Sequence, residues 1–434
     1  MNKHASGGQE PFPRNHHGWT VPGPPKASIH VLFWPGWWYP NRTDPLGGIF
    51  IKKHAEAVSR FCDVSVLYIT PDPTLINKKY DLQYSIENNL RSLRFYYKPG
   101  SRLPLISKIS EFLNYVIAGS RGLRFLKEIT GSPDVIHVNV NPPAGLIFLL
   151  FTRLRKIPYI FTEHWSGYLP ANGSFKGLLR KWLTRCLVKR AGAVTTVSEN
   201  LKNAMLAHKL EGNYHIVPNV VDTDIFHLPT EKENKPGKKR RILHISGLVP
   251  VKNIPGILRV VKRLADKRHD FELNIIGEGE LREEFEHLAL GMGILNEVVF
   301  FHGGKRVEEV AVCMRESDFL LLFSDYENSP CVIVEAMASG LPVLATDVGG
   351  IPELVNERIG VLAAPRDEEG LRAALEMMLD KCTGYDKEYL RAEAVKRFSY
   401  EAVGQVFFNL YNEQKFCGVQ GRFFKRAPGR RRQT

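Results

Sequence analysis

Two glutamates in the C-terminal half of the chain have a spacing that suits the binding of one polar ligand. Glu327 lies in an expected loop after the apolar run 319–322, and Glu335 follows seven intervening residues later on an expected helix. A loop and a turn or two of helix can bring both carboxylates to one ligand, and a carboxylate accepts hydrogen bonds from paired hydroxyls. The spacing predicts a site for a diol, and a surface acidic pair that caps a helix explains it equally well.

The residues between the two glutamates indicate where that helix begins. Ser329 and Pro330 are good residue types for the N-cap and the first helical position. The amides of Cys331 and Val332 are then expected to be free, and free amides at a helix N-terminus bind anions.

These side chains can lie close together only if the loops that carry them are at the same edge of a β-sheet. Short apolar runs alternate with segments of helical periodicity, which predicts α/β domains with parallel sheets. Strands are expected at 29–34, 64–69, 135–138, 159–162, 193–197, 242–245, 273–276, 298–301, 319–322 and 343–345. Helices are expected at 49–60, 105–129, 143–154, 177–190, 199–208, 254–267, 280–290, 307–314, 332–339, 368–379 and 400–412. Ligands of such sheets bind at the carboxyl ends of the strands, so the cleft between two facing domains is the expected site.

The domain organisation is predicted from breaks in this alternation. The segment 229–241, PTEKENKPGKKRR, is charged and aperiodic, and it separates two Rossmann-like halves. The expected parts are a disordered leader (1–27), an N-terminal domain (28–225), a linker (226–240), a C-terminal domain (241–398), a last helix (399–414) and a basic tail (415–434).

The charge is distributed unevenly along the 434 residues. Residues 1–200 carry 26 Lys and Arg against 12 Asp and Glu, whereas residues 251–400 carry 18 against 27. A basic first half suggests an anionic surface or substrate on that side. In the segment 173–192, which contains no acid, apolar residues recur at helical spacing between bases. The pattern fits a helix that packs on its sheet with a basic outer face, or one that docks onto anionic headgroups.

Several other features limit the class of protein. The longest apolar stretch, 144–151, is far too short to cross a bilayer, and isolated cysteines are typical of a reducing cytosol. Asp222 and Asp224 form a DxD pattern inside an expected linker segment, where metal binding is not expected, and no cofactor is expected. The acidic second half and the lack of interleaved aromatic residues argue against nucleic-acid binding.

Several motifs in order make the sequence similar to a known family. The chain resembles the retaining GT-B glycosyltransferases of the glycosyl transferases group 1 family (family 4), from about residue 31 to residue 412. Glu327 and Glu335 match its E-x7-E motif, followed by EAMASGLPVLATDVGGIPELV. The other matching segments are WYPNRTDPLGGIFIKKHAEAV, TEHWSG, VSENL, VPNVVDTDIF, SGLVPVKN and IIGEGELREEFE.

The resemblance implies transfer of a sugar from a nucleotide sugar. The N-terminal domain (28–225) is implied to bind the acceptor and the C-terminal domain (241–398) the nucleotide sugar, with roles for particular residues. Glu335 is implied to bind the ribose hydroxyls, Glu327 the donor sugar, and Lys252 the diphosphate leaving group. His164 is implied to lie beside the donor sugar. The glycines and the residues around the helix start are implied to bind the donor through their backbone or short side chains: Gly47, Gly48, Asn328, Ser329, Cys331 and Val332.

Two positions depart from the family pattern. Gly247 stands where much of the family has an arginine that assists the lysine, so Lys252 acts alone or Arg241, Lys305 or Arg306 substitutes. Asn328 stands where the family has a glycine, which could change the sugar preference.

The sequence therefore predicts a metal-independent retaining glycosyltransferase in the cytoplasm. Its expected partners are a nucleotide sugar, a glycan or lipid-linked acceptor and an anionic membrane surface on the inner face, where it would be peripheral. A GT-B nucleotide-sugar epimerase and a non-catalytic polyanion-binding protein remain as alternatives.

Overall fold

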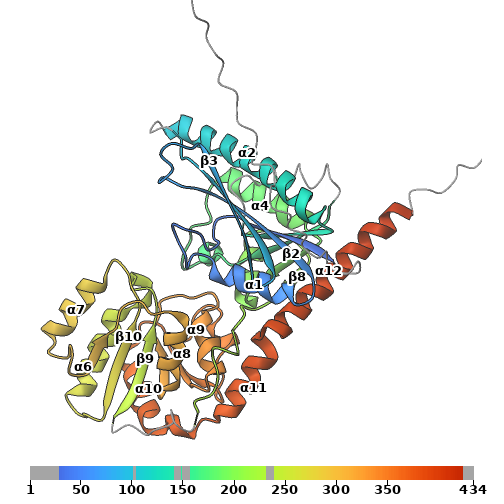
Figure 1. The fold of residues 1–434 in the computed structure, drawn as a ribbon. Helices are drawn as coiled ribbons and strands as arrows, with labels where there is room; N and C mark the ends of the chain where they lie inside the picture. Colours follow the sequence, from blue (N-terminus) through green and yellow to red (C-terminus); the bar gives the residue numbers. More distant parts are fainter. Residues whose placement is uncertain (1–28, 101–103, 141–147, 149–156, 231–238, 424–434) are drawn as a thin grey trace, which may run out of the picture.

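The chain forms two separate β-sheets, each covered by helices (Figure 1). The computed structural model describes residues 29–100, 104–140, 148, 157–230 and 239–423. The expected leader 1–27, most of the linker and, apart from Phe148, the expected helix 143–154 lie outside these ranges.

The first sheet has the strand order β3-β4-β2-β1-β5-β6-β7-β8, in which β3 alone runs antiparallel to its neighbour. Its inner strands are almost wholly buried, as expected for a parallel sheet covered on both faces. The strands are β1 (His30–Pro35), β2 (Asp63–Pro71), β3 (Tyr80–Glu87), β4 (Leu90–Tyr97), β5 (Val135–Asn139), β6 (Tyr159–Glu163), β7 (Ala193–Thr196) and β8 (Tyr214–Ile216).

Two apolar cores divide the helices between the faces of this sheet. One core joins the sheet to α2 (Pro104–Thr130), α4 (Leu178–Arg190) and α5 (Glu199–Ala207). The opposite core joins it to α1 (Ile49–Ser59) and α12 (Tyr400–Phe423). The last helix of the chain therefore returns to the first domain, as Figure 1 shows.

The second sheet is entirely parallel, with the order β11-β10-β9-β12-β13-β14. Its strands are β9 (Arg240–Ile245), β10 (Phe271–Ile276), β11 (Val299–Phe301), β12 (Phe319–Leu322), β13 (Val343–Thr346) and β14 (Gly360–Ala363). One core contains α6 (Ile254–Ala265), α7 (Arg282–Gly291) and α10 (Glu368–Lys381), and the other contains α8 (Val307–Arg315), α9 (Cys331–Ala338) and α11 (Lys387–Phe398). These two parallel sheets confirm the predicted pair of Rossmann-like domains.

The structure adds elements that the apolar pattern did not predict. Strands β3 and β4 form a hairpin whose turn is Asn88 and Asn89, both with positive φ (48° and 63°). Asparagine tolerates that conformation better than most residues, and two such residues suit a tight hairpin. Strands β8 and β14 and helix α11 were also not predicted, because they are short or weakly amphipathic.

Helix α12 is longer than the expected helix 400–412. It continues to Phe423, through a segment that was expected to be tail, because no proline occurs before Pro428. In the described ranges, α12 and the other helices are too short or too polar to cross a bilayer.

Candidate functional site

A cavity of about 310 Å³ lies where the carboxyl ends of the two sheets face each other. Trp38, Phe50 and His164 line it from the first domain, and Lys252, Glu327 and Cys331 line it from the second. The remaining lining residues are Ser166, Val197, Asn219, Val251, Tyr326, Asn328 and Ser329. The loops predicted to form the site thus converge on one cavity.

Lys252 and Glu327 form an ion pair in this cavity. Lys252 ends a short 3₁₀ turn that follows β9, and Glu327 lies in the loop after β12, which is the neighbouring strand. Glu327 also accepts a hydrogen bond from Ser324 Oγ (2.9 Å), and both charged side chains are largely buried. When a ligand binds between a buried cation and a buried anion, the cation can pair with a negatively charged group of the ligand. The anion can then pair with a hydrogen-bond donor or a positive group of the same ligand.

Helix α9 begins at Cys331, one residue before the expected range 332–339 and one residue after Pro330, which was expected to be its first helical residue. Pro330 has an extended backbone (ψ 119°) and is the N-cap, so Ser329 is not the capping residue. Proline supplies no capping side chain, which leaves the first-turn amides of Cys331 and Val332 without a side-chain cap. Burial raises the pKa of the Cys331 thiol to about 12, so the thiol stays neutral. Val332 packs against the apolar core instead of lining the cavity.

The residues next to Glu327 join the two domains directly. Asn328 Nδ2 donates to the carbonyl of His164 (2.9 Å), and Asn328 Oδ1 accepts from Ser198 Oγ (2.9 Å). Asn219 Nδ2 donates to the carbonyl of Ser329 (2.9 Å). A glycine at position 328 could make neither side-chain bond, so Asn328 ties the loop after β12 to the opposite domain.

Glu335 forms a second ion pair, this time across the cleft. Its Oε1 lies 3.0 Å from Nζ of Lys53, which projects from α1 of the first domain. Burial would lower the pKa of Lys53, but the charge and hydrogen bond of Glu335, together with smaller contributions from Cys331 and Asp222, outweigh it and raise that pKa. Glu335 lies beside the cavity and is not among the residues that line it. Lys53 was not predicted, because an exposed helical lysine has the same local sequence signal.

Gly47 and Gly48 shape the loop between β1 and α1. Gly48 has φ 64°, and a Cβ there would approach the Trp38 backbone to 2.5 Å. A Cβ at Gly47 would collide with the Asp44 carboxylate, which accepts a hydrogen bond from the Gly47 amide (2.9 Å). Neither glycine lines the cavity, so their effect on it is through Trp38, which does.

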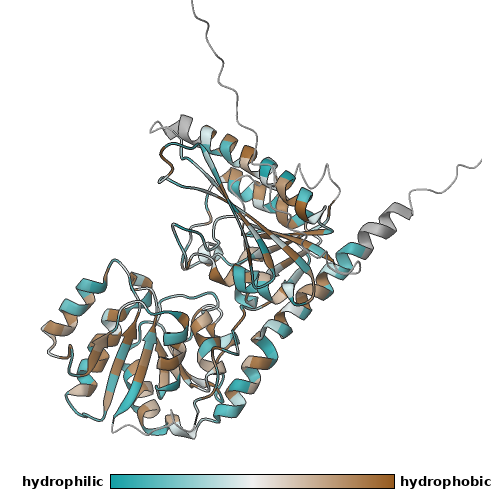
Figure 2. Ribbon diagram, in the orientation of Figure 1, coloured by the Kyte–Doolittle hydropathy of each residue, from teal (hydrophilic) through white to brown (hydrophobic). Residues whose placement is uncertain are grey.

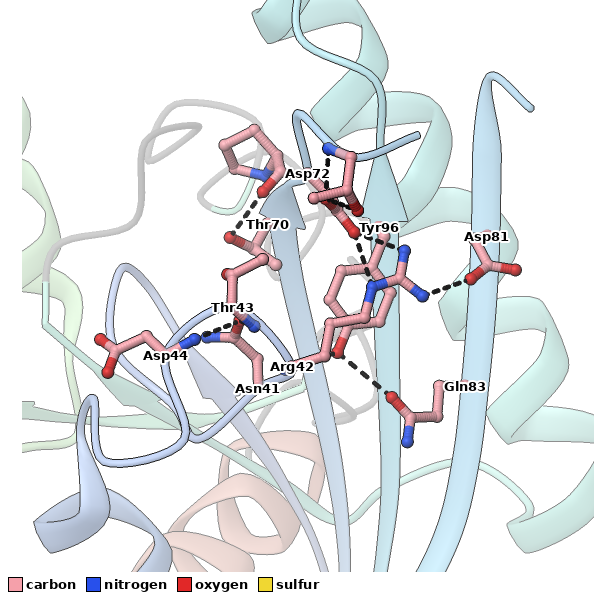
Figure 3. Close-up of polar contacts among 11 residues, drawn as sticks. Asn41, Arg42, Thr43, Asp44, Thr70, Asp72, Asp81, Gln83 and Tyr96 are labelled. Carbon is pink, nitrogen blue, oxygen red and sulfur yellow. Dashed lines mark hydrogen bonds and ion pairs between the residues drawn. The ribbon is translucent and has the colours of Figure 1, made fainter. Parts of the chain in front are cut away.

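The same loop is held to the sheet by an arginine, Arg42 (Figure 3). Arg42 Nε donates to the buried Asp72 (2.6 Å), and its Nη1 donates to Asp81 (2.6 Å). The guanidinium lies over the ring of Tyr96, 4.0 Å from its centroid. Arg42 therefore fastens the loop that carries Trp38 to strands β2, β3 and β4.

His164 supplies an uncharged polar group to the cavity. It lies at the end of β6, and neither ring nitrogen has a hydrogen-bond partner among the described residues. Burial, with smaller contributions from His54 and His137, holds the pKa of His164 well below its usual range. A neutral imidazole can donate one hydrogen bond and accept another from a ligand.

The cations proposed to replace the missing arginine at Gly247 lie elsewhere. Arg241 is near the amino end of β9, opposite to Lys252, and contacts Asp318 and Glu272. Arg306 is exposed and pairs with Glu309. Lys305 is not among the residues that line the cavity. The charged group that does come close is Lys53.

The DxD pattern serves a turn in the connection between β8 and β9. Asp222 Oδ1 accepts the amides of Asp224 (3.0 Å) and Ile225 (3.2 Å). Within the described part of the chain, no group of three or more potential ligands could hold a metal ion.

Family models match both halves of the chain. The model for glycosyl transferases group 1 matches residues 229–396, and the model for glycosyltransferase family 4 matches residues 54–225. Together the two matches span every strand except β1 and include Lys252, Glu327 and Glu335, whereas Lys53 lies just before the match to residues 54–225.

Related proteins span most of the chain at low identity. An MMP alpha-(1->4)-mannosyltransferase of Mycolicibacterium hassiacum is 27% identical over 373 residues, which cover 80% of this chain and 84% of the relative. An N-acetyl-alpha-D-glucosaminyl L-malate synthase of Bacillus anthracis is 26% identical, over 71% of this chain and 78% of the relative.

Solved structures share the arrangement of the two domains. A sucrose-phosphate synthase of Thermosynechococcus elongatus superposes with a TM-score of 0.71 at 18% identity, over 90% of this chain and 100% of that one. Anabaena HepE in complex with UDP-glucose gives 0.64 at 16% identity, over 89% and 100%. With both family models matched in order and this fold, the chain is a GT-B glycosyltransferase that belongs to the glycosyl transferases group 1 family.

Proposed function

We propose that this enzyme transfers a sugar from a nucleotide-sugar donor to an acceptor hydroxyl with retention of the anomeric configuration. The observation that carries the proposal is the gathering of Lys252, Glu327 and the first turn of α9 around one interdomain cavity. The relatives support this class of reaction, because one is named a mannosyltransferase and the HepE structure holds UDP-glucose.

The donor would exchange partners with the two ion pairs. Its diphosphate would take Lys252 and the α9 amides, since an anion is favoured at a helix N-terminus. Glu327, released from Lys252, would accept hydrogen bonds from the donor sugar. Glu335 would accept them from the ribose, and Lys53, released from Glu335, would supply the second positive charge that Gly247 does not.

The chemical step follows from where charge develops. The acceptor oxygen bonds to the anomeric carbon as the carbon–oxygen bond to the diphosphate breaks, on the same face of the sugar. The acceptor proton passes to the departing phosphate oxygen, and Lys252 stabilises the remaining charge. The neutral His164 would hydrogen-bond a donor-sugar hydroxyl, and no cofactor or metal enters the proposal.

The acceptor is proposed to be a lipid-linked or cell-surface glycan precursor, bound by the first domain. The basic composition of residues 1–200 supports an anionic environment on that side. The proposed location is the cytoplasm, at the inner face of the membrane.

Calorimetric titration with UDP-, GDP- and ADP-sugars tests the donor half of the proposal. One of them should bind wild-type enzyme, and binding should weaken at least tenfold in Lys252→Ala while the exposed control Lys262→Ala binds normally. Binding of none of them by wild type would overturn the proposal. An NMR time course with the bound donor and no acceptor checks the alternative, because an epimerase would convert the sugar.

A further inference from the structure

The first domain exposes apolar side chains on two helices that cover the same face of its sheet. Figure 2 shows apolar residues interleaved with polar ones along α2 and α4. Both helices contribute buried residues to one core, so their outer sides face away from the sheet together. We call the exposed residues named below the α2–α4 surface.

In the first two turns of helix α4, apolar side chains point to solvent and not to the sheet. Leu178 is 89% exposed, Leu179 69% and Trp182 50%, whereas Leu187 and Val188 in its last turns are buried. Of the two interpretations left open for this segment, packing on the sheet therefore describes only the second half of the helix. The chain turns sharply into α4 at Gly177, and only the C-terminal half of the helix reaches the core.

Helix α2 repeats the arrangement. Ile109, Leu113 and Ile117 are exposed at four-residue intervals on one side of the helix, with Phe112 beside them. Arg121 and Arg124 continue outward along the following turns, and both are exposed. Apolar side chains in the first half of a helix and bases in the second half suit a boundary between hydrocarbon and headgroups.

The bases on α4 are available for an anionic partner. The segment 173–192 contains no acid, and Lys176, Arg185, Lys189 and Arg190 are exposed. In the described structure none of these four forms an ion pair with a carboxylate. Apolar residues alone would fit any partner, but unpaired bases among them select one with negative charge.

The surface lies at the mouth of the cleft. Arg180, near the start of α4, places its guanidinium 5.1 Å from the centroid of the Trp37 ring and 4.9 Å from that of Trp165, in the loops after β1 and β6. Asn114 in α2 contacts the carbonyl of Lys98, just after β4. Both helices therefore begin at the sheet edge that faces the cavity.

We propose that the α2–α4 surface docks onto an anionic lipid bilayer and holds the mouth of the cleft against it. Apolar side chains enter the boundary between headgroups and hydrocarbon, and the flanking bases pair with lipid phosphates. The docking itself is independent of the reaction, while the delivery of a lipid-linked acceptor to the cavity rests on the proposed function.

Sedimentation of the full chain with lipid vesicles tests the docking. Wild type should bind vesicles containing phosphatidylglycerol at least tenfold more tightly than vesicles of phosphatidylcholine alone, and added salt should weaken that binding. The variant Leu178→Ser/Leu179→Ser/Trp182→Ser should lose at least tenfold in binding. A second variant, Arg185→Glu/Lys189→Glu, should lose the preference for phosphatidylglycerol.

Matched controls come from the second domain. Leu290→Ser/Met377→Ser and Lys381→Glu change exposed residues of the same kinds and should bind vesicles like wild type. Equal binding of both lipid mixtures by wild type, or undiminished binding by the triple variant, would overturn the proposal. Donor titration of the same variants keeps the two proposals separate, because absent donor binding in wild type contradicts the proposed function and leaves the vesicle result standing.

Discussion

The two sides of the cleft differ in how they contribute to it. The second domain presents charge at the carboxyl ends of β9 and β12, through Lys252 and Glu327. The first domain presents rings, Trp38, Phe50 and His164, of which the imidazole is held neutral by burial. The exception is Lys53, which crosses to Glu335.

The second domain therefore binds the charged part of a ligand, whereas the first domain shapes the space in which the ligand lies. A charged group near the departing diphosphate acts on the transition state, whereas neutral rings define where a sugar can lie. Substitutions on the second-domain side should therefore change the rate most, and those on the first-domain side should act on fit and stability.

The largest expected effect comes from removal of the second-domain cation. Lys252→Ala should lower kcat/KM by about 10²–10³-fold, the usual range for loss of one group that stabilises developing charge. The measurement is steady-state transfer with the donor identified by titration. His164→Ala, on the opposite side of the cleft, should lower kcat/KM less. A larger decrease in kcat/KM for His164→Ala than for Lys252→Ala would contradict the proposed division of roles between the two domains.

Acid should destabilise the first domain before the second. In the first domain, burial lowers the pKa of four histidines, His30, His54, His137 and His164, and that of His54 falls to about 4. In the second domain, the fully buried histidine is His244, whose pKa burial also lowers to about 4. Since the unfolded chain binds these protons near pH 6.5, the free energy of unfolding should fall between pH 6.5 and 4. The fall amounts to roughly 3 kcal/mol for each histidine with a pKa near 4.

Tryptophan fluorescence can follow this transition selectively, because all six tryptophans lie in residues 1–200. The fluorescence change should occur at higher pH than the loss of far-UV circular dichroism, which reports both domains. His54→Gln should shift the fluorescence transition to lower pH. Coincident transitions would show that the domains unfold together.

The ion pair between Lys53 of the first domain and Glu335 of the second should couple the stabilities of the two domains. Lys53→Met leaves Glu335 partly buried without its cation, and it should lower the free energy of unfolding by about 2–3 kcal/mol, toward the low end for a broken buried pair. A cycle with Glu335→Gln and the double variant measures the coupling by denaturant unfolding. Additive single effects would show that the pair contributes no coupling.

The smallest expected effect belongs to the neutral bridge at Asn328. Asn328→Ala removes the side-chain bonds to the His164 carbonyl and Ser198, and each such bond contributes about 1 kcal/mol. Donor KM should rise less than in Lys252→Ala, and the ratio of kcat/KM for two donor sugars should change. An unchanged ratio would mean that Asn328 only joins the domains.

Much of the fold was predictable because its signals are local. The apolar runs that became β1, β2, β5 and β12 are buried on both faces and need no partner to be recognised. The hairpin of β3 and β4 was not predicted, because its half-exposed residues give a weaker pattern of apolar residues and its Asn88–Asn89 turn lacks the usual glycine.

The candidate site was predictable only in part. The convergence of Lys252, Glu327, Cys331 and His164 follows from their places after strands of two parallel sheets. The N-cap of α9 was assigned to Ser329 and is Pro330 in the structure, because the sequence does not fix the backbone conformation of Pro330. Their catalytic and binding roles stay predictions.

By itself, the sequence determined that there are two mainly parallel sheets, most of their strands and helices along the chain, and the loops that carry the polar side chains, since these depend on neighbouring residues along the chain. Only the tertiary structure decided that Lys53 pairs with Glu335, that α12 packs against α1 of the first domain, and that the first half of α4 stays exposed. Each of those depends on how two distant surfaces meet, and the energy of such a contact comes from burial and charge that no local pattern contains.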